Sequence, residues 1–257
     1  MKKNLILEIF FPSFKKKIKE LEEKNQKATK KIAELERLLA IIAHDLRSPF
    51  NSFLGLTELL ASDHEIPIEK QKQHFKAANI QAENTFNMLT SLLNWARIQI
   101  GQNPVSLLDF NLKEVVDNVI NLLQKNALEK QISIINKVPS NIFVLADTDI
   151  TEIVIRNLVS NAIKFSLKDG VIIISKIVVG STLKVSITDT GVGIKPDNLK
   201  RLFSSEIQST LGTNNEKGSG IGLMFCRDLI EKQGGKIWAT SNSKGSTFTF
   251  TLKLAKK

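Results

Sequence analysis

The stretch NLVSNAIKFS, at residues 157–166, says more about the fold than any other part of the chain. Four of its side chains stand four, three and one residues apart and so share one face of a helix: Asn157, Asn161, Lys164 and Phe165. Amide oxygens suit a hard cation such as Mg²⁺, a lysine can meet phosphate charge, and a phenylalanine can pack against a base. The simpler interpretation is a polar helix edge with one core phenylalanine. Asparagines inside a helix weaken it, however, and therefore require a reason.

A turn that contains two glycines follows in the sequence DTGVGI, at residues 189–194. It comes directly after a strand predicted at 182–188, because apolar and polar residues alternate there with a period of two. Asp189 is an acceptor at the strand end and suits the amino group of adenine. Gly191 and Gly193 allow the backbone to turn sharply and to approach a ligand closely. An ordinary turn explains the same residues, so this motif alone is a weak signal.

A second glycine motif, GSGIGL at residues 218–223, opens a helix predicted at 220–233. Glycines at the N-terminus of a helix expose N–H groups that bind phosphate oxygens. The candidate phosphate contacts are Gly218, Gly220 and Gly222. The preceding residues 204–220 are rich in Ser, Thr, Asn and Gly and predict a mobile lid over the phosphates. No GxxxxGK(S/T) is present and no strand–glycine–helix unit with a ribose-binding acid follows. The sequence therefore supports neither a Walker-type site nor a dinucleotide fold.

The region around these motifs mixes helices with strands. Helices are predicted at 112–129, 149–165 and 220–233. Strands are predicted at 171–178, 182–188 and 248–254. Elements in this order predict a sheet covered by helices on one face, an α/β sandwich in a chain of the α+β class.

Two long helices are predicted before this region. Residues 15–46 carry apolar residues spaced by three and four, as in a coiled coil. Asn25 falls on that seam, where one buried asparagine often sets a parallel dimer. Residues 68–100 form a second amphipathic helix after a loop at 61–67. A lone pair of such helices buries little, whereas two copies would close a four-helix bundle. The alternative for the first helix is packing against its own chain.

The sequence HDLRSP, at residues 44–49, lies on the first helix. A neutral imidazole is a competent nucleophile near neutral pH. Asp45 can bond one ring nitrogen of His44 and leave the other free to attack phosphorus. Pro49 removes a helix hydrogen bond and predicts a kink just beyond His44. Most surface histidines have no function, but the neighbouring proline and the dimerising helix favour one here.

Composition narrows the class of protein. The chain has 257 residues, 42% of them hydrophobic and 24% charged, which is typical of a soluble protein of one or two domains. The net charge is +10, but no nucleic-acid-binding motif accompanies it, so we expect no nucleic acid partner. The single cysteine, Cys226, fits a reducing compartment. No run reaches the ~18 apolar residues that a membrane span needs, so we expect a cytoplasmic chain, with membrane association through the N-terminus left open.

Together the motifs resemble those of two-component sensor histidine kinases. HDLRSP resembles the phosphoacceptor box of that family. The family's other boxes are matched in order by NLVSNAIKFS, DTGVGI, Leu202-Phe203, GSGIGL and GSTF at 245–248. The resemblance covers about residues 35–254 and implies a helical-hairpin dimerisation domain followed by an α/β sandwich that binds ATP. The expected domains are a signalling coiled coil at 1–36, a dimerisation and phosphotransfer domain at 37–103, and an ATP-binding catalytic domain at 104–257.

The resemblance also implies roles for single residues. His44 would accept the phosphoryl group and Asp45 would act as its general base. Asn161 would hold Mg²⁺, with Asn157 and Lys164 near the phosphates. The other positions would line the ATP pocket: Phe165 against the nucleotide, Asp189 on adenine with Gly191, Gly193 and Thr247 shaping its surroundings, and Gly218, Gly220 and Gly222 beside the phosphates.

The activity that the resemblance implies is autophosphorylation of His44 by ATP, followed by transfer to an aspartate of a response regulator receiver domain. The chain would act as a homodimer, with ATP and Mg²⁺ bound and with an upstream sensor protein or sensor region supplying the signal. Ser48 stands where the family usually has Thr or Asn, a residue that assists dephosphorylation of the partner, so that activity stays open. Two alternatives remain: a non-catalytic ATP-binding scaffold, and an ATPase clamp of the topoisomerase type.

Overall fold

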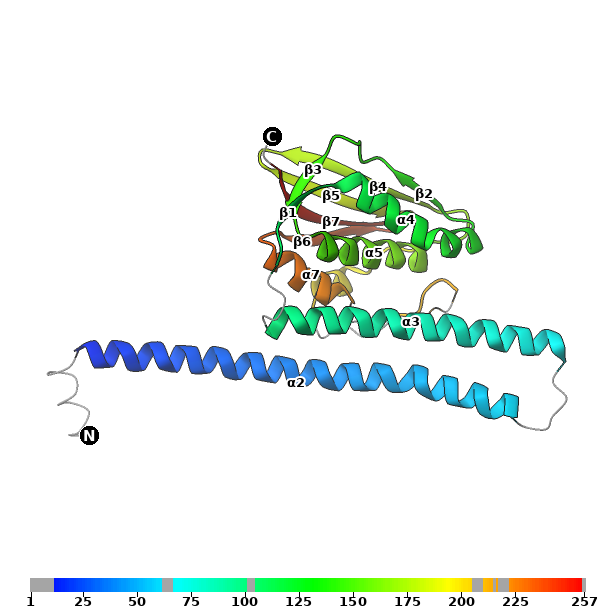
Figure 1. Ribbon diagram of the computed structural model, residues 1–257, viewed down its shortest axis with the longest axis horizontal. Coiled ribbons are helices and arrows are strands. Elements are labelled where there is room, and N and C mark those ends of the chain that lie inside the picture. The colour runs from blue at the N-terminus through cyan, green and yellow to red at the C-terminus, as the bar shows by residue number, and fades with distance from the viewer. Residues whose placement is uncertain are drawn as a thin grey trace. The chain divides into compact units, whose positions relative to one another are not determined.

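The computed structural model describes residues 12–61, 67–100, 105–204, 210–214, 216 and 222–255. The chain divides into two units, residues 1–82 and 83–257, and each is described on its own. Two long helices come first, α2 (Pro12–Ala61) and α3 (Ile68–Ile100), and an assembly of strands and shorter helices follows (Figure 1).

The second predicted helix has the expected bounds, whereas the first is longer than its heptad pattern. Helix α2 extends beyond the predicted heptad stretch at 15–46, continues through Pro49 and ends at Ala61, where the loop between the two helices was predicted to begin. The kink predicted there stays a prediction. Pro67 accepts hydrogen bonds from the backbone N–H groups of Lys70 and Gln71, at 2.9 and 3.1 Å, and so begins α3. Proline suits a helix start because its missing N–H would have no partner inside the helix.

Among the described residues of the second unit, seven strands form one sheet. Their order is β1-β3-β7-β5-β4-β2, and β6 also pairs with β7. Only β2 and β4 run parallel, and the other pairs are antiparallel. The strands are β1 (Leu108–Asn111), β2 (Ser133–Asn136), β3 (Phe143–Ala146), β4 (Val171–Val179), β5 (Thr182–Asp189), β6 (Ile237–Asn242) and β7 (Gly245–Leu254). One edge of β7 pairs with β5, so β6 and β3 share its other edge, at opposite ends.

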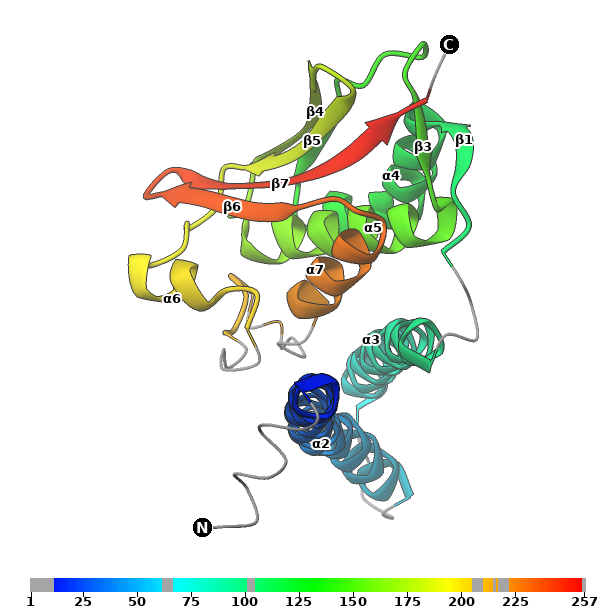
Figure 2. The same ribbon diagram turned by 90° about the vertical axis from the view of Figure 1, so that its left-hand side faces the viewer.

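Three helices cover one face of this sheet, as Figure 2 shows. They are α4 (Leu112–Glu129), α5 (Thr148–Phe165) and α7 (Gly222–Lys232). The short α6 (Pro196–Arg201) follows β5. Strand β5 explains the layering, because its apolar residues Leu183, Val185 and Ile187 are fully buried while the polar residues between them are only half-buried. The predicted α/β sandwich is confirmed.

Two side-chain caps begin the helices that carry this core. Asn111 accepts a hydrogen bond from the N–H of Lys113 at the start of α4, and Asp147 accepts one from Ile150 at the start of α5. The other carboxylate oxygen of Asp147 accepts the N–H of Ser106 at 2.9 Å, which ties the chain before β1 to α5. Helix α5, with its polar face, is therefore anchored at its first turn.

Candidate functional site

Asp189, the last residue of β5, is a buried carboxylate with one oxygen held by the backbone. Its Oδ1 accepts the N–H of Gly191 at 2.9 Å and the N–H of Ser246, on β7, at 3.1 Å. Only 4% of the residue is exposed. Burial raises the pKa of the Asp189 carboxyl, although the two N–H donors act in the opposite direction. Within the described residues no hydrogen bond is made to Oδ2, so the geometry leaves this oxygen as an acceptor, as the predicted contact with adenine requires.

Glycines make the close contacts that surround this carboxylate. Gly245 has φ +139°, and a Cβ there would collide with the carbonyl oxygen of Asp189. A Cβ on Gly191 would collide with the carbonyl oxygen of Phe165, the same oxygen that accepts the N–H of Val192 at 3.2 Å. The turn after β5 is thereby joined to the end of α5.

The structure supplies an intramolecular reason for the glycines of this turn. Sequence analysis interpreted Gly191 and Gly193 as positions where the backbone approaches a ligand. Gly193 has φ +69° and lies against the carbonyl of Asn242 at the end of β6, while Gly191 lies against α5. Both positions therefore require glycine because the turn packs closely against the ends of α5 and β6.

Asn157 and Asn161 lie one turn apart on α5. The Nδ2 of Asn161 donates to Oδ1 of Asn157 at 3.1 Å. Gly222, the first residue of α7, adjoins the same amide, because a Cβ there would collide with the side chain of Asn157. No described residue bonds Oδ1 of Asn161, so this hard oxygen fits the predicted Mg²⁺ ligand.

Lys164 ends the polar face of α5. Its Nζ donates to the carbonyl oxygen of Thr210 at 2.8 Å and lies 4.7 Å from the centre of the Phe165 ring. Burial lowers the pKa of the Lys164 ammonium and neighbouring Lys130 lowers it further, whereas the carboxylate of Glu216 raises it. The partly desolvated ammonium of Lys164 thus lies beside the ring of Phe165. Such an arrangement suits a ligand that carries a phosphate next to a base.

Thr247 lies on β7 and pairs with Thr188 of β5. Its hydroxyl is 3.0 Å from that of Thr188, which precedes Asp189 on the paired strand. Because side chains alternate along a strand, Asp189 points to the face of the sheet opposite that of Thr188 and Thr247. The predicted place of Thr247 in the pocket of Asp189 is therefore wrong, and the residue of β7 that contacts this carboxylate is Ser246.

Several predicted site residues lie outside the described part of the structure. Gly218 and Gly220 do so entirely, and the predicted lid at 204–220 is described only in part. His44, Asp45 and Ser48 lie on helix α2, but their side chains are not described.

Three residues of the site were missed by sequence analysis. Lys130 follows α4, and Thr213 and Glu216 fall within the segment that was interpreted as a lid. Lys130 Nζ pairs with the Glu216 carboxylate at 2.7 Å and donates to the Thr213 hydroxyl at 2.7 Å. No local signal marks them, because lysines after helices and polar residues in glycine-rich segments are common.

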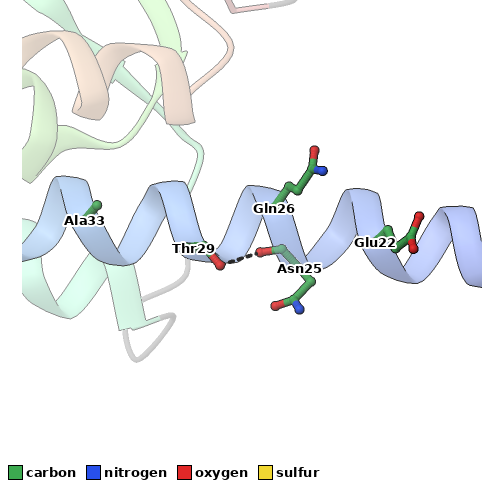
Figure 3. Close-up of a pocket in the computed structure, with 5 residues that line it drawn as sticks. All are labelled: Glu22, Asn25, Gln26, Thr29 and Ala33. Carbon is green, nitrogen blue, oxygen red and sulfur yellow. Dashed lines mark hydrogen bonds between the residues drawn. The ribbon is translucent and has the colours of Figure 1, made fainter.

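Other features of the described residues point to no second centre. The hollow in Figure 3 is lined by one face of α2, with the Thr29 hydroxyl bonded to the Asn25 carbonyl at 2.9 Å. Within the described ranges, no group of three or more His, Cys, Asp or Glu side chains could hold a metal ion. None of the described helices is both long and apolar enough to cross a membrane.

Two protein families match the two parts of the chain. Residues 34–101 match the His Kinase A (phospho-acceptor) domain, and residues 146–256 match the Histidine kinase-, DNA gyrase B-, and HSP90-like ATPase. The first match includes His44 and the second includes α5 and Asp189. The chain belongs to the sensor histidine kinases of two-component systems.

Curated relatives are longer than this chain. Sensor protein GacS of Pseudomonas syringae pv. syringae is 28% identical over 227 residues, 85% of this chain and 25% of its own length. Adaptive-response sensory kinase SasA of Crocosphaera subtropica is 31% identical over 230 residues, 84% of this chain and 59% of its own length. The chain therefore spans less than two thirds of the length of each of these relatives.

Solved structures share the fold. The catalytic domain of histidine kinase ThkA is 28% identical with a TM-score of 0.51, over 57% of this chain and 95% of that domain. Histidine kinase ThkA in complex with response regulator protein TrrA reaches a TM-score of 0.66 at 24% identity, over 91% of this chain and 66% of that chain.

Proposed function

We propose that this chain is an ATP-dependent autokinase that phosphorylates His44 and then passes the phosphoryl group to an aspartate of a response regulator receiver domain. The observation that carries the proposal is the presence in one chain of a phospho-acceptor domain match that contains His44 and an ATPase domain match that contains the Asp189 pocket. A protein that only bound ATP would not need the former.

Asp189 is the proposed adenine-binding residue. Its Oδ1 is already occupied by two backbone N–H groups, so Oδ2 would accept the exocyclic amino group of adenine. The rigid pair of strands around it favours selectivity, because a ligand without that amino group would leave a buried acceptor without a donor. Phe165 would pack against the nucleotide, and the N–H of Ser246 would hold Asp189 in place.

The polar face of α5 would hold the triphosphate. Lys164 would exchange the carbonyl of Thr210 for phosphate oxygens, and Asn157 would lie beside them. Oδ1 of Asn161 would be a ligand of Mg²⁺, which, when bound, neutralises charge on the phosphates. Gly218, Gly220 and Gly222 would border the phosphates through their N–H groups.

The phosphoryl transfer itself needs little covalent chemistry from the protein. A neutral ring nitrogen of His44 would attack the γ-phosphorus, the bond from phosphorus to the β–γ bridging oxygen would break, and ADP would leave. Asp45 would accept the proton of the other ring nitrogen and so offset the developing positive charge. Transfer from phospho-His44 to a receiver carboxylate, with return of the proton from Asp45 to the ring, would then regenerate the neutral imidazole. The complex of ThkA with the response regulator TrrA supports a receiver domain as the partner.

A homodimer is the proposed working form. Ile18, Leu21 and Ile32 lie on the predicted coiled-coil seam and are 46%, 57% and 56% exposed in the single chain. Apolar side chains at such spacing gain by packing against a second copy.

One labelling experiment tests the proposal. Incubation with γ-labelled Mg-ATP should yield an acid-labile, alkali-stable phosphoprotein, and His44→Gln should abolish it without loss of ATP binding. His74→Gln, which changes a histidine outside the site, should keep the label. Label retained by His44→Gln would refute the role of His44. ATP binding without any label would favour the scaffold, and steady phosphate release without a phosphoprotein would favour the clamp.

A further inference from the structure

A buried lysine outside the predicted site stands at a junction between three parts of the ATP-binding unit. Lys130 is the C-terminal cap of α4, and the chain turns sharply after it because Gln131 has φ +57°. Only 8% of Lys130 is exposed. Its Nζ meets four acceptors at 2.7–2.8 Å: the carbonyl oxygens of Ile163 and Lys164, the hydroxyl of Thr213 and Oε1 of Glu216.

The first two acceptors close the end of α5. The last carbonyls of a helix have no partner inside it, and a cation is favoured there by the helix dipole. By reaching from α4, Lys130 therefore stabilises the turn of α5 that carries Lys164 and Phe165.

The other two acceptors belong to a short turn after α6. Glu216 closes this turn: its carbonyl accepts the N–H of Gly212 at 2.9 Å, and its Oε2 accepts the N–H of Asn214 at 2.8 Å. Its Oε1 is the oxygen that meets Lys130. One carboxylate oxygen of Glu216 thus holds the turn, and the other binds the ammonium of Lys130.

Thr213 fastens the same turn to α5. Its N–H donates to the carbonyl of Lys164 at 3.1 Å, and its hydroxyl donates to the carbonyl of Ser166 at 2.7 Å. Since Thr210, in the same segment, accepts the ammonium of Lys164, the direction of the Lys164 side chain depends on where this turn is held.

We propose that Lys130 is a positioning residue for the triphosphate: with Thr213 and Glu216 it clamps residues 210–214 and Glu216 onto the end of α5 and thereby places Lys164. The inference rests on the proposed ATP-binding function, but it concerns the phosphate end alone. Burying an ammonium costs free energy unless it is paired and hydrogen-bonded. The four acceptors around Lys130 offset that cost, which indicates a specific structural role for this lysine. Replacing it by an apolar residue removes the clamp and leaves Glu216 without its cation.

The test compares two ligands that share adenine and differ in phosphate. Lys130→Met should weaken Mg-ATP binding about tenfold, the effect of losing a charged hydrogen bond, while adenosine binding stays within about twofold of the wild type. Competition against a fluorescent ATP analogue measures both ligands in the full chain. Lys125→Met, an exposed lysine on the same helix, is the matched control and should change neither.

A second pair of variants separates positioning from folding. Glu216→Gln keeps the shape and an acceptor but removes the charge, so it should weaken Mg-ATP binding in the same direction and by less. The double variant Lys130→Met/Glu216→Gln should bind Mg-ATP no more weakly than Lys130→Met, because both changes break one clamp. Glu231→Gln, an exposed glutamate of α7, is the control.

Three results would overturn the inference. They are unchanged Mg-ATP affinity in Lys130→Met, equal weakening of adenosine and Mg-ATP, and additive effects in the double variant. All three are binding measurements, so they remain decisive even if the labelling of His44 fails and the kinase proposal itself is wrong.

Discussion

The two ends of the candidate ATP site are built in different ways. Asp189, at the adenine end, is held by backbone N–H groups from a turn and from β7, both fixed by the sheet. Lys164, at the phosphate end, is a side chain whose present partner is a loop carbonyl, Thr210. Backbone atoms of a paired sheet cannot reorient, whereas a lysine on a four-carbon stem can. The difference suits a site that recognises one base rigidly and then adjusts to phosphates that change during the reaction.

The largest expected effect comes from breaking the rigid end. In Asp189→Asn the side-chain oxygen must face the N–H groups of Gly191 and Ser246, so its NH₂ takes the place of Oδ2 and meets the amino group of adenine. The hydrogen bond between Oδ2 and the adenine amino group is then replaced by two N–H donors that face each other. This change should weaken the binding of both adenosine and ATP by about 2–3 kcal/mol. Isothermal titration measures both affinities. Asp109→Asn changes an exposed residue of β1 and should alter neither affinity. Unaltered affinities in Asp189→Asn would show that Asp189 does not bind adenine.

Breaking the adjustable end should have a smaller and different effect. Lys164→Met removes the cation that is proposed to meet the transferring phosphoryl group, so the rate of autophosphorylation should fall about 10–100-fold. Adenosine affinity should stay within twofold, because Asp189 is untouched. Rapid-quench labelling and competition binding give the two values, with Lys168→Met as an exposed control. A parallel loss of adenosine binding would show that the two ends are not separate.

The smallest expected effect is a pH dependence of stability. The pKa of the Asp189 carboxyl is raised in the folded state, so the folded chain binds more protons than the unfolded chain above the ordinary pKa of about 4. The contribution of Asp189 to the free energy of unfolding should therefore fall as pH rises from that value through the folded pKa. Urea unfolding across this pH range should show this decrease in the free energy of unfolding in the wild type and not in Asp189→Asn. A difference that rises with pH would contradict the sign.

The sequence predicted the larger elements because their patterns are long. The period-two alternation in β5 and the apolar runs of α3, α4 and α5 are repeated over eight or more residues, and the observed bounds agree within one residue. Strands β1, β2 and β3 are only four residues each, too short for any period to stand out. The end of helix α2 at Ala61 agrees with the predicted start of the loop between the two helices, because the polar residues and the proline of that loop are a clear local signal.

By itself the sequence determined which chemical groups are available, and in which local order. It placed Asn157, Asn161, Lys164 and Phe165 on one helical face and Asp189 at a strand end before two glycines, because such relations depend on spacings of a few residues. Only the tertiary structure decided that Oδ1 of Asp189 is held by the N–H of Ser246, 57 residues away, and that Lys130 clamps Glu216 onto the end of α5. Contacts of that separation depend on how the sheet pairs and how the helices cover it, and no local pattern in the chain encodes them.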